Sequence, residues 1–158
     1  MSLALSDALT ALLAGAPHEV LEHAPATSAR DAAHARGTPL RSGGKSLVLR
    51  IDRLGVAVLV VGSDRRVDGR LLRRSLGVQR YRFLTPDELD TLTGLSPGEV
   101  PALGRPLIDA ALYVGEDLLA REELIFAAAR RDRSVRMRTA DWLALARPVV
   151  VPTFTVAE

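Results

Sequence analysis

The chain has 158 residues, a net charge of +2 and no cysteine, and 47% of its residues are apolar. This length predicts one domain, residues 1–158, with a core of its own. The absence of cysteine excludes disulfides, thiol nucleophiles and zinc–thiolate sites. No run of 18 apolar residues occurs, and the first 29 residues hold no Lys or Arg, which argues against a membrane span and a secretory signal. We therefore expect a cytoplasmic protein.

Periodic patterns predict alternating helices and strands through the first half of the chain. In order they are a helix over residues 3–13, a strand over 20–23, a helix over 29–36, strands over 45–51 and 56–61 joined as a hairpin, a helix ending at 76, a strand over 81–84 and a short helix ending at 92. Ser28, followed by Asp31, resembles a capping box, and Gly37 ends that helix. Asp68 is the expected cap of the third helix, and Pro86 occupies the first position of the fourth.

The second half opens on an irregular segment, residues 93–106, that is rich in glycine and proline. A loop of this length inside a compact domain is usually functional or disordered. Strands are predicted near residues 111–114, 123–128 and 135–138, followed by a helix capped by Thr139 with Trp142 as a core anchor. Antiparallel hairpins mixed with helices predict an α+β fold around one mixed sheet.

Arginine is the dominant basic residue, and it is concentrated in two segments. Residues 65–82 hold seven arginines against one acid, and residues 130–138 hold five against one acid. Such clusters fit either a surface that follows phosphates or a solvated face, and the sequence leaves both open. Only six aromatic residues are present, so a stacking platform for single-stranded nucleic acid is not expected.

The single lysine, Lys45, follows Gly43 and Gly44 and begins an apolar run. A lysine kept among so many arginines indicates a need for a compact ammonium rather than a planar guanidinium. The two glycines would let the backbone approach a ligand closely. The alternative is that this one basic position simply escaped the bias toward arginine.

Three matches to catalytic motifs fail because the chain lacks other features that each motif requires. The stretch 44–46 is similar to the end of a P-loop, but Pro39 stands where the first glycine is needed and a strand follows. The stretch 94–98 fits G-x-S-x-G, but Pro97 has no N–H for an oxyanion and no histidine follows the serine. The stretch 42–45 fits S-x-x-K, whose K-T-G partner would need a second lysine.

Segments distributed over nearly the whole chain resemble the YbaK/ProX family, relatives of the editing domain of bacterial prolyl-tRNA synthetases. The similar stretches, in order, are 25–27, 31–33, 44–49, 67–68, 76–77, 92–94, 97–104 and 106–109. The resemblance implies an α+β fold with a mixed, partly barrel-like β-sheet flanked by helices. It also implies hydrolysis of the ester that joins a wrong amino acid to the 3′ end of a tRNA.

Under this resemblance Lys45 matches the family's central lysine, and Gly98 opens the loop around the terminal adenosine. The implied substrate contacts are Ser46, Gly98, Glu99, Val100, Pro101, Ala102, Ala127 and Ala128. The exposed arginines Arg70, Arg73 and Arg74 would hold the tRNA backbone. No cofactor and no metal are expected, since His18, His23 and His34 lack ligand-spaced acids and favour surface or packing roles.

The sequence departs from the family pattern at two places. Ala102 replaces the final proline of the loop motif, and the stretch 127–129 is all alanine where the family often has a serine or histidine followed by glycines. Two functions are therefore open. One is a free-standing deacylase, with tRNA-Pro carrying alanine or cysteine as the expected substrate and prolyl-tRNA synthetase as an expected partner. The other is a non-catalytic relative that binds tRNA ends, nucleotides or a protein.

Overall fold

The computed structural model describes residues 3–158, which form five α-helices, two 3₁₀-helices and ten strands. The helices are α1 (Leu3–Leu13), α2 (Ala29–Arg36), η1 (Leu40–Ser42), α3 (Gly69–Leu76), α4 (Pro86–Thr93), η2 (Glu116–Ala120) and α5 (Thr139–Ala146). The strands are β1 (Glu19–Glu22), β2 (Gly44–Ile51), β3 (Gly55–Gly62), β4 (Arg65–Val67), β5 (Tyr81–Phe83), β6 (Ala111–Gly115), β7 (Glu123–Ala127), β8 (Arg133–Arg138), β9 (Val149–Val151) and β10 (Thr155–Ala157).

The strands form three sheets rather than the single mixed sheet predicted from the sequence. The largest has the order β5-β2-β3-β6-β9, with β2 antiparallel to its neighbours and β6 parallel to both β3 and β9. A three-stranded antiparallel sheet has the order β1-β8-β7, and β4 pairs with β10. A parallel bridge between Gly43 and Ile125 links the start of β2 to β7. The expected mixed α+β architecture is confirmed, but the strands are divided.

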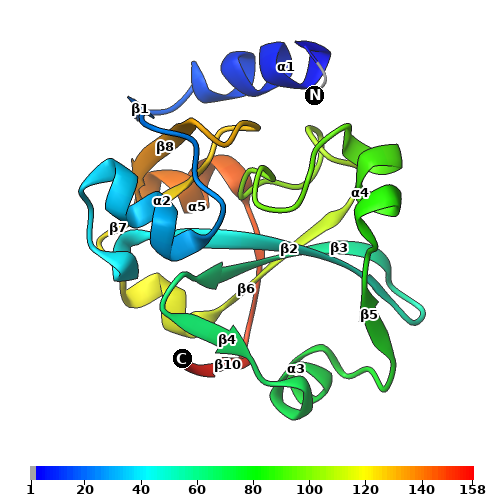
Figure 1. The fold of residues 1–158 in the computed structure, drawn as a ribbon. Helices are drawn as coiled ribbons and strands as arrows, with labels where there is room; N and C mark the ends of the chain where they lie inside the picture. Colours follow the sequence, from blue (N-terminus) through cyan, green and yellow to red (C-terminus); the bar gives the residue numbers. More distant parts are fainter. Residues whose placement is uncertain (1–2) are drawn as a thin grey trace.

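Hydrophobic residues pack on both faces of the five-stranded sheet. On β3, Val58 and Val60 belong to a cluster that includes Trp142 of α5, whereas Leu59 faces a second cluster that includes Leu72 of α3. This double burial explains why β3 is almost uniformly apolar. The helices α1 and α3 lie at opposite ends of the molecule, with this sheet between them (Figure 1).

Side-chain caps begin three of the helices, two of them at the residues that the sequence predicts. Ser28 Oγ accepts from Asp31 N, Asp68 Oδ1 accepts from Leu71 N, and Thr85 forms a full capping box with Glu88. The prediction that Thr139 caps α5 is wrong. The cap is Arg138, which gives no side-chain hydrogen bond. Thr139 is the first residue of the helix, and its buried hydroxyl has no hydrogen-bond partner within residues 3–158.

The long loop between α4 and β6 packs into the core instead of standing away from it. Leu95, Val100 and Ala102 are buried, and Trp142 Nε1 donates a 2.8 Å hydrogen bond to Ala102 O. Gly98 has φ of +91°, a left-handed conformation that favours glycine, and nothing lies near its Cβ position.

None of the helices in residues 3–158 has the length and hydropathy to cross a membrane.

Candidate functional site

A cavity of about 200 Å³ lies where the start of α2, the starts of β2 and β8 and the loop after α4 meet. It is smaller than the roughly 300–1,000 Å³ typical of drug-sized ligand sites. Its lining residues are His23, Ala26, Thr27, Ser28, Ala29, Ala32, Arg36, Gly44, Lys45, Ser46, Leu47, Ser63, Gly98, Val100, Ala127, Arg130, Arg131 and Ser134. The cavity is therefore built from segments that are distant in the sequence.

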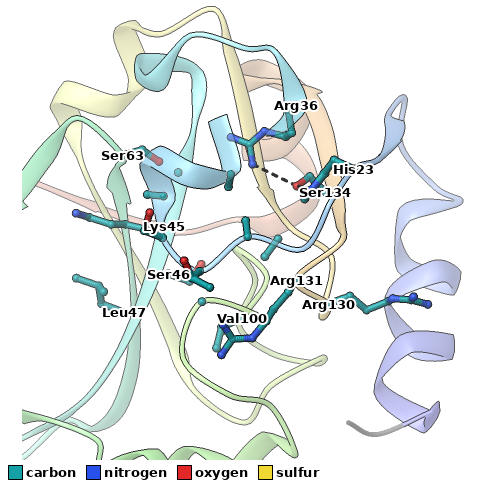
Figure 2. A pocket seen from close by; sticks show the side chains of 18 residues that line it. His23, Arg36, Lys45, Ser46, Leu47, Ser63, Val100, Arg130, Arg131 and Ser134 are labelled. Atoms are coloured by element: carbon teal, nitrogen blue, oxygen red, sulfur yellow. Dashed lines mark hydrogen bonds between the residues drawn. The ribbon is translucent and has the colours of Figure 1, made fainter. Parts of the chain in front are cut away.

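Three polar side chains meet on one wall of the cavity (Figure 2). Arg36 Nη1 donates to Ser134 Oγ over 3.2 Å, and Ser134 Oγ lies 2.8 Å from His23 Nε2. Because His23 Nδ1 lies 2.8 Å from Ala24 O, and a carbonyl only accepts, Nδ1 carries the proton in the neutral ring. Ser134 then donates to Nε2 while accepting from Arg36. The result is a directed chain of hydrogen bonds inside the cavity.

The charged lining of the cavity is entirely cationic. Arg36, Lys45, Arg130 and Arg131 line it, and no Asp or Glu is among the lining residues that the structure describes. Burial lowers the pKa of Arg36, the direction expected for a guanidinium removed from water without a carboxylate partner. Arg130 is neutralised by Asp132, with two hydrogen bonds of 2.8 and 2.9 Å. Such a lining favours an anionic ligand.

Lys45 lines the cavity, and its ammonium lies at the rim. Its Nζ is 3.7 Å from Glu158 Oε2, and its side chain is 30% exposed. In Figure 2 the Lys45 side chain extends to the side of the view away from His23 and Ser134. The Lys45 ammonium is therefore turned away from the polar wall.

The two residues beside Lys45 are both closely surrounded by other residues, and one of them carries a hydroxyl without a partner in the described part of the chain. Ser46 Oγ is buried and has no hydrogen-bond partner in the described part of the chain. A Cβ on Gly44 would stand 2.5 Å from Leu124 Cδ1, so a side chain here would displace the buried Leu124 side chain. Lys45 itself lies in the strand β2, so no helix N-terminus follows it as a P-loop would require, and the P-loop match fails.

Only part of the loop expected to contact substrate reaches the cavity. Gly98 and Val100 line it, whereas Pro101 and Ala102 are buried in the core and Glu99 accepts a hydrogen bond from Ser96 N. These last three residues therefore support the loop rather than line the cavity.

The alanine stretch at the end of β7 contributes one lining residue. Ala127 lines the cavity, whereas Ala128 is buried and does not line it. Ala129 has φ of +64°, the conformation that the glycine of the family pattern would adopt without strain.

The arginines expected to contact tRNA lie on α3 and do not line the cavity. All three are exposed, and Arg73 stacks over the Tyr81 ring at 5.2 Å. Arg70 and Arg74 form no side-chain ion pair among residues 3–158. They are available to an external partner.

Sequence reasoning missed the polar wall because its members meet only in the fold. Ser134 is 111 residues from His23 and 98 from Arg36. The one local signal was the short distance along the chain between Ala127 and Ser134, which suits two residues paired across a hairpin. The strand predicted over residues 135–138 did not include Ser134, so this pairing was not expected. His23, expected at the surface or in packing, instead lines the cavity. No group of three or more metal-ligating side chains occurs within residues 3–158.

Comparison with known proteins assigns the chain to a family. The model of the aminoacyl-tRNA editing domain matches residues 23–145, a range that contains every lining residue of the cavity. The chain belongs to the aminoacyl-tRNA editing domain family. The YbaK/ProX resemblance is thereby confirmed, and the family is one of aminoacyl-tRNA deacylases, which are hydrolases.

Individual relatives agree with this placement. The Escherichia coli (strain K12) multifunctional Ser/Thr-tRNA deacylase ProXp-y is 32% identical over 151 residues, which cover 90% of this chain and 89% of the relative. The crystal structure of a proposed trans-editing enzyme for prolyl tRNA synthetase has a TM-score of 0.80 at 26% identity and covers 97% of this chain and 99% of its own. A hypothetical protein, APE2540, shares the fold with a TM-score of 0.81 at 20% identity.

Proposed function

We propose that this editing-family protein hydrolyses the ester between a small amino acid and the 3′ end of a tRNA, acting as a free-standing deacylase. One observation carries the proposal. Lys45, Gly98 and Ala127, which the family resemblance assigns to the substrate, line one cavity whose charged lining is entirely cationic. A site of that charge suits the phosphates beside an aminoacyl ester. It offers less to an uncharged substrate.

The reaction needs little from the protein because an aminoacyl ester is already activated. The oxygen of a water molecule bonds to the ester carbonyl carbon, the bond from that carbon to the ribose oxygen breaks, and the water's proton ends on the ribose oxygen. The Lys45 ammonium would stabilise the negative charge that develops on oxygen or hold an adjacent phosphate. Glu158 would leave the ammonium when the substrate's anionic groups arrive.

Among small aminoacyl groups we place seryl and threonyl ahead of the alanyl and cysteinyl groups expected from the sequence. The polar wall places the Ser134 hydroxyl, held by His23 and Arg36, in the same cavity as Ala127. A site built to bond a hydroxyl discriminates strongly against a substrate that lacks it. The 32% identical relative is described as a Ser/Thr-tRNA deacylase, which agrees with this order.

The tRNA itself would be held outside the cavity. Arg70 and Arg74 are exposed on α3 and form no ion pair within residues 3–158, and we assign them contacts with the tRNA backbone. Prolyl-tRNA synthetase is the proposed partner, supported by the structural relative that is assigned to trans-editing for that enzyme.

The test is deacylation of a panel of aminoacyl-tRNAs by the purified protein. The panel holds seryl-, threonyl-, alanyl- and cysteinyl-tRNA and a bulky control such as isoleucyl-tRNA, each with its cognate tRNA and with tRNA-Pro. We expect seryl and threonyl esters to be hydrolysed fastest and the bulky ester to survive. Faster removal of alanine or cysteine would restore the sequence-based expectation. No hydrolysis of any member would favour the non-catalytic alternative.

A further inference from the structure

Arg36 is a half-buried cation that forms no ion pair with any side chain in the described part of the chain. Its Nη1 donates to Ser134 Oγ and its Nε to Thr38 Oγ1, both uncharged oxygens. None of the ion pairs among residues 3–158 involves it, and its Nη2 has no partner in that range. A desolvated guanidinium is usually paired with an anion, because losing water without one is unfavourable.

The unpaired nitrogen and the Ser63 hydroxyl lie close together over a glycine. A Cβ on Gly43 would stand 2.5 Å from Ser63 Oγ and 3.2 Å from Arg36 Nη2, so both groups flank one small volume. Gly43 has φ of −81°, so glycine is not needed there for its backbone conformation. A side chain at this position would instead collide with Ser63 and crowd Arg36. Arg36 and Ser63 both line the cavity.

The arrangement determines which ligand would suit this space. A guanidinium N–H and a hydroxyl lie side by side here, and none of the described residues that line the cavity is a carboxylate that would compete for the cation. The carboxyl group of an aminoacyl-tRNA is esterified and uncharged, so the only anions near the ester are phosphates. The nearest is the 5′-phosphate of the terminal nucleotide.

We propose that Arg36 and Ser63 form a phosphate cradle over Gly43 that binds the 5′-phosphate of the nucleotide carrying the amino acid. The choice of this phosphate rests on the proposed function, whereas the anion site itself rests on the geometry. Arg36 would then act on two parts of the substrate. Its Nη1 orients Ser134 on the polar wall beside the aminoacyl group, and its Nη2 faces the cradle that binds the phosphate. The cradle would let the enzyme distinguish a nucleotide-borne ester from a free one.

The test compares binding of adenosine 5′-monophosphate and adenosine by calorimetry. We expect the wild-type protein to bind the monophosphate about tenfold more tightly or better, the effect of a charge-assisted contact. Arg36→Gln and Ser63→Ala should reduce this preference, and Gly43→Ala should do so by filling the cradle. Arg30→Gln is the control, because Arg30 is exposed on the same helix and does not line the cavity.

Thermal unfolding shows whether each variant is folded, and Ser63→Ala keeps the test valid if Arg36→Gln is not. A monophosphate preference equal to that of the wild type in folded Arg36→Gln and Ser63→Ala would overturn the cradle, as would no preference in the wild type. Deacylation is assayed separately. An Arg36-dependent preference without hydrolysis would refute the proposed function alone, and hydrolysis without the preference would refute the cradle alone.

Discussion

Ser134 stands directly opposite Ala127 in the antiparallel pairing of β8 with β7, and both residues line the cavity. Residues in such a pair project to the same face of a sheet. The polar group that the alanine stretch lacks is therefore present on the neighbouring strand. Ser134 also bonds His23 and Arg36, which fix its position.

Replacing Ser134 with alanine should change substrate preference more than it changes turnover of the smallest substrate. The variant loses the wall's hydroxyl, so hydrolysis of seryl- and threonyl-tRNA should fall by about tenfold or more relative to alanyl-tRNA. Single-turnover rates on the three substrates measure the ratio. An equal loss on all three would assign Ser134 a structural role instead.

A hydroxyl added at Ala127 tests whether a shortage of polar contacts on the polar wall limits the rate of hydrolysis. Ala127→Ser places a second hydroxyl beside Ser134 and restores the residue type that the family often has there. We expect hydrolysis of small aminoacyl esters to increase severalfold, with bulky esters still excluded by the small cavity. Unchanged or slower hydrolysis of every small ester would show that Ser134 already meets this need.

The arginines of α3 should contribute affinity that depends on salt. Arg70→Gln combined with Arg74→Gln should weaken tRNA binding and reduce the slope of log affinity against log salt by about 1–2. Single-turnover hydrolysis at saturating tRNA should stay unchanged, since neither residue lines the cavity. Arg147→Gln, an exposed change after α5, is the control. A slope equal to that of the wild type would remove α3 from the tRNA contact.

The start of α4 should lose stability in acid. Arg82 bonds both carboxylate oxygens of Glu88 at 2.7 and 2.8 Å, and this pair, with Thr85 N, lowers the pKa of Glu88 to about 2. A lowered folded pKa gives stability that is present above about pH 4.5 and lost as the pH falls toward 2. Glu88→Gln should therefore lower Tm by about 1–3 °C at pH 7, and less at pH 3.

The control for this prediction is Asp87→Asn. It removes a charge from the same helical turn, but Asp87 forms no ion pair among residues 3–158. A Tm difference between Glu88→Gln and wild type that stays constant from pH 7 to pH 3 would contradict the assigned role of the Arg82–Glu88 pair.

Local signals in the sequence predicted the elements whose structure depends on near neighbours. The helix α2 begins and ends where Ser28 and Gly37 predict, and the β2–β3 hairpin lies within a residue of its expected bounds. The short strands β4, β9 and β10 were not predicted. Each has three residues, and each pairs with a segment far along the chain, so no local pattern marks it.

The candidate site likewise contains residues that the sequence predicts and residues whose role depends on tertiary contacts. Lys45 and Gly98 were identified from composition and from the family resemblance, and both line the cavity. The cap predicted at Thr139 failed because the chain enters α5 from β8 without a break, which leaves the preceding residue as the cap. Residue type and spacing cannot show that Arg36 lacks a carboxylate partner, because pairing is decided by tertiary contacts.

The central claim is that this cavity hydrolyses aminoacyl esters with the help of the Lys45 ammonium. The most direct measurement is the single-turnover rate of seryl-tRNA hydrolysis by wild type, Lys45→Ala and Lys45→Arg, with Glu158→Gln as the control that frees the ammonium. Both Lys45 variants should remain folded and lose about 100-fold or more in rate, because a planar guanidinium does not replace a point charge in a fitted site. Glu158→Gln should match or exceed wild type. Near-normal hydrolysis by Lys45→Ala would contradict the account.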